Sequence, residues 1–290
     1  MLLSAILTGL VLGGTYALVA MGLTLQYGVA RIMNLAYGDI IIAASFGALV
    51  LFTGLGINPL LAMVVILPAS FALNWVIYAV MLQPLARRSK DRGRLEGDSI
   101  LTTFGLLFLI QGIALVIFGA GFQNYSFLAG PVTILGTTMQ LNRVLAFALA
   151  LALGLGLYLL LNRTRFGTVI RAVAANPASA PLVGINADAV ARFAFALGGA
   201  LAAAGGVVVS MYLTFSATMG VVFTMKALIV VIMGGVGNLL GALAAGLLLG
   251  LVETMVASFI DPGLTLAATY LLFLAVLVIR PQGLFGKAAR

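Results

Sequence analysis

Few side chains in this sequence could bind a polar ligand, and several of them gather near its start. Residues 33–39 read MNLAYGD, and together with Arg31 they place an amide, a phenol and a carboxylate within nine residues of a chain that is only 8% charged. A helix that starts after such a break presents free N–H groups and the positive end of its dipole, which suit a carboxylate. The candidate ligand-binding residues are Asn34, Tyr37, Gly38 and Asp39.

Most other kinds of chemistry are excluded by what the sequence lacks. There is no cysteine and no histidine, which removes thiolate nucleophiles, the usual general base and the commonest metal ligand. There is no Gly-x-x-x-x-Gly-Lys-Ser/Thr motif, since GLFGKA at 283–288 has the wrong glycine spacing. Asp39 and Glu253 could form the carboxylate pair of an intramembrane enzyme, but no motif accompanies either. We expect no catalytic residue, no metal site and no cofactor in this chain.

A second stretch able to shape a ligand pathway reads GGVGN, at residues 234–238. Glycines so close together free backbone from the helix, which lipid does not tolerate unless protein or water covers it. We therefore expect a broken or closely packed helix pair here. Glycines interrupt apolar helices in both halves of the chain, at residues 36–47 and 234–250. This recurrence suggests the internal repeats that are common in transporters. The pathway candidates here are Gly234, Gly235, Gly237 and Asn238.

The composition indicates that lipid surrounds most of the chain. Its 290 residues are 63% hydrophobic, with a mean hydropathy of +1.23, whereas a soluble domain carries roughly 25% charged residues. Several apolar stretches approach the length of about 20 residues that crosses a bilayer as helix, and they are continuous rather than alternating, which argues against a β-barrel. The prediction is one all-α transmembrane domain over residues 1–290.

The distribution of charge gives the predicted topology. Twelve of the 15 basic residues lie in residues 84–98, 162–192 and 280–290, so the positive-inside rule makes these two loops and the tail cytoplasmic. This placement in short loops also argues against a nucleic-acid partner. Residues 119–140 carry no charge and read as an external loop. The expected helices are about 4–28, 39–54, 60–83, 99–118, 142–161, 193–214, 219–235, 239–258 and 264–279.

The number of crossings depends on residues 39–54. Three full crossings before residue 84 place the N-terminus outside, whereas a half-helix at 39–54 that turns back places it inside. Eight membrane segments, including broken or re-entrant helices, is the central estimate.

Four ionisable residues are candidates for a position inside the membrane: Arg31, Asp39, Lys226 and Glu253. An ionisable group at membrane depth costs roughly 2.5–3.5 kcal/mol on insertion scales, so it usually faces a cavity or a partner. Arg31 and Lys226 could instead extend to an interface, Glu253 could lie near the outer surface, and Asp39 could serve only as a helix N-cap.

The loop at 162–192 is the most informative. Asn176 followed by Pro177 has the form of a helix start, and Gly184 is a helix-stop signal. A brief helix of small residues at 177–183, between basic flanks, suits docking to a partner protein. An ordinary capped loop helix is the alternative.

This loop resembles the cytoplasmic coupling loop of LivH-like permease subunits of branched-chain amino-acid ABC importers. Three other regions, 13–39, 234–253 and 277–286, are also similar to that family, so the resemblance covers essentially the whole chain. Tyr37, Asp39 and Ser179 depart from the residues that many members carry. The matching positions in the loop are Arg163, Thr164, Phe166, Gly167, Arg171, Ala172, Ala174, Asn176, Pro177, Leu182, Gly184 and Ile185.

The resemblance implies an importer subunit in the bacterial inner membrane, multi-pass, with a cytoplasmic C-terminus. It implies a second, LivM-like permease, two ATPase subunits that bind ATP and Mg²⁺, and a periplasmic binding protein that delivers branched-chain or related amino acids. Urea, short amides or aromatic acids are alternative cargoes, and an ion-coupled secondary transporter or a channel-like protein is an alternative class. The implied coupling residues are Arg171, Asn176, Pro177, Ala178, Ser179, Leu182 and Gly184.

Overall fold

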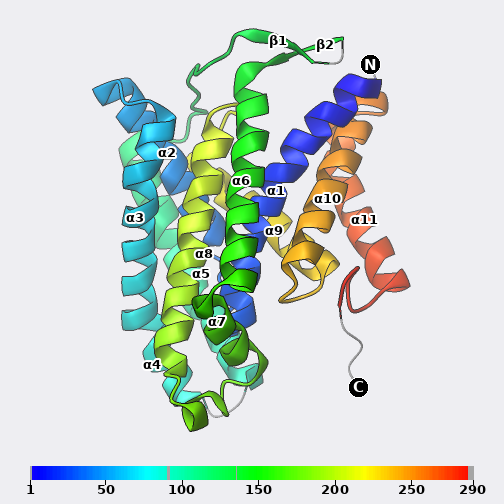
Figure 1. Cartoon of the computed structure of the whole chain (residues 1–290). Helices are drawn as coiled ribbons and strands as arrows, with labels where there is room; N and C mark the ends of the chain where they lie inside the picture. Colours follow the sequence, from blue (N-terminus) through cyan, green and yellow to red (C-terminus); the bar gives the residue numbers. More distant parts are fainter. Residues whose placement is uncertain (1, 90–91, 135, 287–290) are drawn as a thin grey trace.

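The protein is a bundle of long helices in a computed structural model that describes residues 2–89, 92–134 and 136–286 (Figure 1). Lys287 and Arg290 of the predicted tail lie outside the described residues. Among the residues described, nine helices are long and apolar enough to cross a membrane, which confirms the polytopic all-α prediction. The count exceeds the estimate of eight because Tyr37–Leu55 is a full 19-residue helix rather than a half-helix.

The elements follow the predicted order closely. Helix α3 (Pro59–Ile77) continues through a π-helical turn (Tyr78–Leu82) into α4 (Gln83–Arg88), so these pieces form one 30-residue span. A two-stranded antiparallel sheet lies in the uncharged loop, with Pro131 opposite Gln140. The elements are α1 (Leu2–Ala30), α2 (Tyr37–Leu55), α3 (Pro59–Ile77), α4 (Gln83–Arg88), α5 (Arg92–Phe118), β1 (Pro131–Ile134), β2 (Thr137–Gln140), α6 (Leu141–Arg163), α7 (Arg165–Ala175), α8 (Ala187–Ser210), α9 (Gly220–Gly234), α10 (Leu239–Phe259) and α11 (Thr265–Ile279).

The bundle has two distinct ends. Figure 1 shows β1 and β2 at one end, which we call the hairpin end, and α4 and α7 at the other, which we call the coupling end. The start of α1 lies at the hairpin end, whereas α11 runs towards the coupling end. The two predicted cytoplasmic loops therefore share one end, and the first three helices all cross the bundle.

Helix α8 forms the centre of the bundle. Nearly all of its length is buried, and it packs against α1, α2 and α3. Its glycine carbonyls accept hydrogen bonds from neighbouring helices: Ser70 Oγ donates to Gly199 O (2.9 Å) and Ser45 Oγ donates to Gly206 O (2.8 Å). Because lipid offers no hydrogen bonds, such interhelical pairs help to fix the helices around α8.

Helices α1 and α10 touch through their backbones. A Cβ atom on Gly13 would lie only 2.8 Å from Leu247 Cα, and one on Gly246 would lie 2.6 Å from Ala17 Cα. Gly13 and Gly246 thus let the two helix backbones approach closely. The contact places Tyr16 of α1 beside α10.

The outer surface is apolar, as lipid requires. Exposed side chains on α3, α5 and α11 are largely Leu, Val, Ile and Phe, including Val116, which is 88% exposed, and Val278, which is 82% exposed. In water such a surface would aggregate. In a bilayer it is the expected contact with hydrocarbon.

Candidate functional site

The predicted helix break near residue 33 is present and is covered by protein. Arg31 follows α1 in a left-handed backbone conformation (φ 56°), and the chain stays non-helical until α2 begins. Two side chains of α5 bond to this backbone: Ser99 Oγ accepts from Met33 N (3.3 Å) and Thr103 Oγ1 accepts from Leu35 N (3.1 Å). The freed amides therefore find partners away from lipid.

Asn34 stabilises the entry into α2. Its Oδ1 accepts from Ala36 N (3.1 Å), and its Nδ2 donates to Gln26 Oε1 (3.2 Å). Gln26 Nε2 donates in turn to Phe195 O on α8 (2.8 Å). The alternative in which Asp39 caps the helix is wrong, because α2 begins before Asp39 and has no side-chain cap bond.

Tyr37 and Gly38 join this break to the bundle. Tyr37 is fully buried and its hydroxyl donates to Val19 O in α1 (2.8 Å). Gly38 N donates to Thr224 Oγ1 in α9 (2.8 Å), and Thr224 Oγ1 donates to Leu35 O (3.0 Å). Gly38 is required by close approach rather than by backbone angle, since a Cβ there would lie 2.7 Å from Thr224 N.

Asp39 is the candidate residue that carries unused hydrogen-bonding capacity. It is 2% exposed, and neither carboxyl oxygen has a hydrogen-bond partner among the described residues. The carboxyl group lies against Gly220, where a Cβ would collide with it. It thus stands in the first turn of α2 and beside the start of α9, where helix dipoles favour negative charge.

The GGVGN stretch is the tight turn between α9 and α10. Gly234 touches Gly241 across the turn, leaving no room for a Cβ on either residue. Gly235 (φ 96°) and Gly237 (φ 81°) adopt backbone conformations that favour glycine. The expectation of a closely packed helix pair is confirmed.

Asn238 fastens this turn. Its Oδ1 accepts from Gly241 N (3.1 Å), which caps α10, and its Nδ2 donates to Phe285 O (3.0 Å). The segment after α11 also bonds to the end of α9, through Leu284 N to Met233 O (2.7 Å). Asn238 therefore joins the turn to the C-terminal segment at the coupling end.

The loop after α7 has the predicted start and stop. Asn176 Oδ1 accepts from Ala178 N and Ser179 N (3.2 Å each), and Gly184 is left-handed (φ 76°). The helix is shorter than the expected 177–183, because only Ala180–Val183 form a single 3-10 turn. Pro177 and its neighbours form the turn that precedes it.

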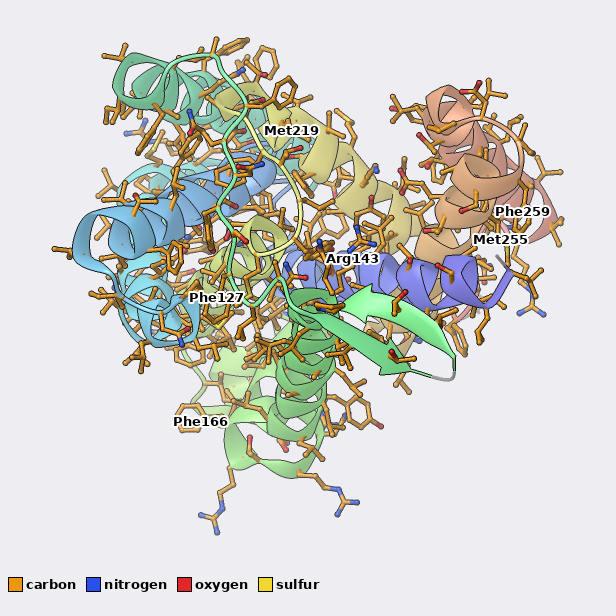
Figure 2. All side chains as sticks on the ribbon, turned by 90° about the horizontal axis from the view of Figure 1, so that it is seen from above. Phe127, Arg143, Phe166, Met219, Met255 and Phe259 are labelled. Carbon is orange, nitrogen blue, oxygen red and sulfur yellow. The ribbon has the colours of Figure 1, made fainter. Side chains whose placement is uncertain are left out.

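The tip of this loop presents apolar side chains away from the bundle. Leu182 is 86% exposed and Val183 is 73% exposed, whereas Ala180 beside them is buried. Figure 2 shows Phe166, which is 69% exposed, at the edge of the molecule. Arg171 lies in α7, before the loop, and its guanidinium group donates to Asn162 Oδ1 in α6 (2.9 Å).

A pocket of about 680 Å³ at the coupling end brings two of the predicted groups together. It is lined by α1, α6, α7, the α9–α10 turn and the segment after α11. Arg171 of the coupling candidates meets Gly237 and Asn238 of the glycine turn there, whereas Asn34, Tyr37, Gly38 and Asp39 do not line the pocket. The polar side chains on its wall are Thr24, Arg31, Tyr158, Asn162, Arg171 and Asn238.

A buried ion pair joins α9 to α10. Lys226 Nζ lies 2.5 Å from Glu253 Oε1 and 2.6 Å from the Tyr16 hydroxyl of α1. The Lys226 side chain is 13% exposed and is engaged in this pair. The Glu253 side chain is 8% exposed. Arg31, by contrast, borders the coupling-end pocket and donates to Ala174 O (3.3 Å).

Three residues near this pair were not predicted as functional. Tyr16 bonds Lys226, the Tyr212 hydroxyl bonds Thr15 Oγ1 (2.9 Å), and Arg143 has a buried Nε without a partner among the described residues. Lys226 and Glu253, as lone charges in apolar segments, gave a usable signal. The tyrosines gave none, because a tyrosine in an apolar helix is common in cores.

Comparison with known proteins places this arrangement in a family. The family described as branched-chain amino acid transport system / permease component matches residues 5–280. The high-affinity branched-chain amino acid transport system permease protein BraD of Pseudomonas aeruginosa is 27% identical over 98% of this chain and 96% of its own length. The probable branched-chain amino acid transport permease protein LivH of Methanocaldococcus jannaschii is 30% identical, covering 93% and 88%.

A solved structure shows a related fold. A chain of PsaBC from Streptococcus pneumoniae, in complex with Fab, matches with a TM-score of 0.53 over 97% of this chain and 92% of that chain, at 14% identity. Since the family match extends over nearly the whole sequence and the bundle carries the helices it requires, this chain belongs to the family of branched-chain amino acid transport system permease components.

Proposed function

We propose that this chain is the membrane-spanning permease subunit of an ATP-binding cassette importer for branched-chain or related amino acids. The observation that carries the proposal is the family match over residues 5–280, which leaves only short terminal segments unmatched. The relatives compared above are named as permeases for branched-chain amino acids, which favours these cargoes over urea, short amides or aromatic acids.

Energy is supplied from outside this chain. The sequence has no nucleotide-binding motif, so ATP and Mg²⁺ bind to two separate ATPase subunits, and this chain needs no cofactor and is not an enzyme. The exposed Leu182 and Val183 at the tip of the coupling-end loop form the docking point for an ATPase. Closure of the ATPase pair on ATP then moves this loop and α7, which lies directly before it.

The remaining partners follow from the subunit's place in an importer. A second, LivM-like permease pairs with this one, and a periplasmic binding protein delivers the cargo at the hairpin end. In this proposal the complex lies in the bacterial inner membrane, with the coupling end and the C-terminus in the cytoplasm; the apolar outer surface and the basic loops at the coupling end support it.

Two groups of residues serve the translocation pathway in this proposal. The break at Asn34, Tyr37, Gly38 and Asp39 supplies a helix start and an unpaired carboxyl group inside the bundle. The turn at Gly234, Gly235, Gly237 and Asn238 supplies a pivot at the coupling end. Transport proceeds as motion of the coupling end alters the packing between these groups.

The docking step is tested by copurification. Burying a Leu side chain contributes roughly 1.5–3 kcal/mol, so Leu182→Asp should reduce ATPase copurification with a tagged permease by at least tenfold. Phe122→Asp, at a 75% exposed position of the hairpin-end loop, is the matched control and should retain the ATPases. Undiminished copurification and undiminished cargo-stimulated hydrolysis in the Leu182 variant would contradict the docking role.

A further inference from the structure

The ion pair between α9 and α10 lies among the most buried charges of the described chain. Lys226 and Glu253 both fall inside candidate membrane spans, and Tyr16 of α1 completes the cluster. The two charged side chains retain 13% and 8% exposure. Three helices thus converge on one pair of opposite charges within the bundle.

Packing alone gives no reason for charges at this place. Removing two charges from water carries a large desolvation cost, and apolar side chains of similar volume in place of a buried ion pair are often neutral or stabilising. Ionisable groups inside a membrane usually face a cavity, a pathway or a partner. Backbone contacts at glycines already join α1 to α10, at Gly13 and Gly246, and α9 to α10, at Gly234 and Gly241, so neither contact depends on the pair.

Part of the hydrogen-bonding capacity of this ion pair is unused within the described residues. Glu253 Oε2 is buried and has no hydrogen-bond partner among the described residues. Lys226 donates to Tyr16 and to Glu253, so one of its three N–H groups is left over within the described contacts. The site therefore offers one spare anionic acceptor and one spare cationic donor, side by side.

Polar groups continue from the pair towards the hairpin end. Tyr212, after the end of α8, bonds Thr15 and lies within electrostatic range of both Arg143 and Glu253. Figure 2, which looks down from the hairpin end, shows Arg143 near the middle of the bundle. A polar ligand entering from that end would meet these groups before it reached Lys226.

The helices that carry the pair share a pivot. Helix α9 has only 15 residues and turns into α10 through Gly234, Gly235 and Gly237. Separation of α9 from α10 at the level of Lys226 and Glu253 would require a rotation at this turn. The exposed apolar face of α9 next to Lys226, formed by Val221, Val222 and Met225, leaves that side of the helix free within this chain.

We propose that Lys226 and Glu253 bind the charged groups of the cargo during transport. When α9 and α10 separate, Lys226 binds the α-carboxylate of an amino acid and Glu253 binds its α-ammonium group, and the pair closes again once the cargo has passed. The inference rests on the proposed function. It assigns to this chain the recognition of the α-carboxylate and α-ammonium groups, which all amino acids share, while the side chain of the cargo is selected elsewhere.

The test uses the complete complex, reconstituted in proteoliposomes with its binding protein and radiolabelled leucine. Lys226→Met/Glu253→Leu removes both charges at similar volume, so assembly and melting temperature should stay close to those of the wild type. Initial uptake should fall at least tenfold, and the ATP hydrolysed per leucine transported should rise at least fivefold. Glu253→Gln, which keeps size and hydrogen bonding, should show the same loss.

Arg87→Gln is the matched control, because it breaks an exposed ion pair with Asp188 at the coupling end. It should leave uptake within twofold of the wild type. Uptake within twofold by the double variant or by Glu253→Gln would overturn the proposal, as would a double variant that no longer assembles, since the pair would then be structural. A wild-type complex that hydrolyses ATP but takes up no leucine would instead refute the proposed function.

Discussion

Replacing Gly13 by alanine tests whether α1 and α10 touch through their backbones. The added Cβ would lie 2.8 Å from Leu247 Cα, 2.9 Å from Gly246 O and 3.0 Å from Leu247 O. All three atoms belong to backbone, so no side-chain rotation can relieve the overlap. An ordinary contact begins at 3.4 Å, so the two helices must move apart by at least about 0.6 Å.

The magnitude follows from two opposing effects. Overpacking of this kind costs about 1–3 kcal/mol, while alanine in place of glycine in a helix gains up to about 1 kcal/mol. Gly156→Ala in α6 is the control, because nothing lies within 4 Å of its added Cβ. The control variant has the favourable helix propensity of alanine without the steric overlap. The difference in unfolding free energy between the two variants therefore gives the packing cost of about 1–3 kcal/mol.

The assay is thermal unfolding of the purified protein in detergent, followed by fluorescence and by loss of the monodisperse peak in size-exclusion chromatography. Gly13→Ala should melt several degrees below Gly156→Ala. Because Tyr16 lies one turn along α1 from Gly13, leucine uptake should also fall in the first variant. Equal melting temperatures for the two variants would refute the backbone contact between α1 and α10.

Three further variants have distinct expected outcomes. Asp39→Leu should impair uptake more than assembly, because the buried carboxyl makes no hydrogen bond that assembly needs; normal uptake would exclude Asp39 from the pathway. Asn238→Ala removes a cap and the bond to the C-terminal segment, and should lower the unfolding free energy by about 1–2 kcal/mol; an unchanged melting temperature would count against that role. Arg87→Ala breaks an ion pair with Asp188 whose side chains are 66% and 43% exposed, so the unfolding free energy should fall by less than about 1 kcal/mol. A melting temperature lowered by many degrees would contradict this small contribution.

The sequence predicted the helices well because lipid imposes a simple rule on them. Every span had to be long and apolar with few charges, and the glycine and charged segments marked the turns. The error in the count arose at residues 39–54, where a buried break at Asn34 and Gly38 resembled a re-entrant helix. The 19-residue length of α2 shows that it is long enough for a complete span, and Ser99 and Thr103 hold the break that precedes it.

The sites were less predictable than the spans. Asn176 and Gly184 act locally, through a turn and a helix stop that depend on neighbouring residues, and these predicted roles are confirmed. Asn238, predicted only as a pathway residue, also acts locally as the cap of α10. The partners of Lys226 and Glu253 depend on how α1, α9 and α10 pack, because the contacting residues are separated by 27 and 210 positions in the sequence. No local pattern encodes such a meeting, so the cluster became visible only in the fold.

Uptake by the reconstituted complex tests the central claim most directly. Proteoliposomes that contain this chain, its partner permease and the two ATPases should take up leucine only when ATP is supplied on the side of the coupling end and the loaded binding protein on the side of the hairpin end. Uptake that proceeds without ATP or ATPases, driven by an ion gradient alone, would contradict the account and identify a secondary transporter instead.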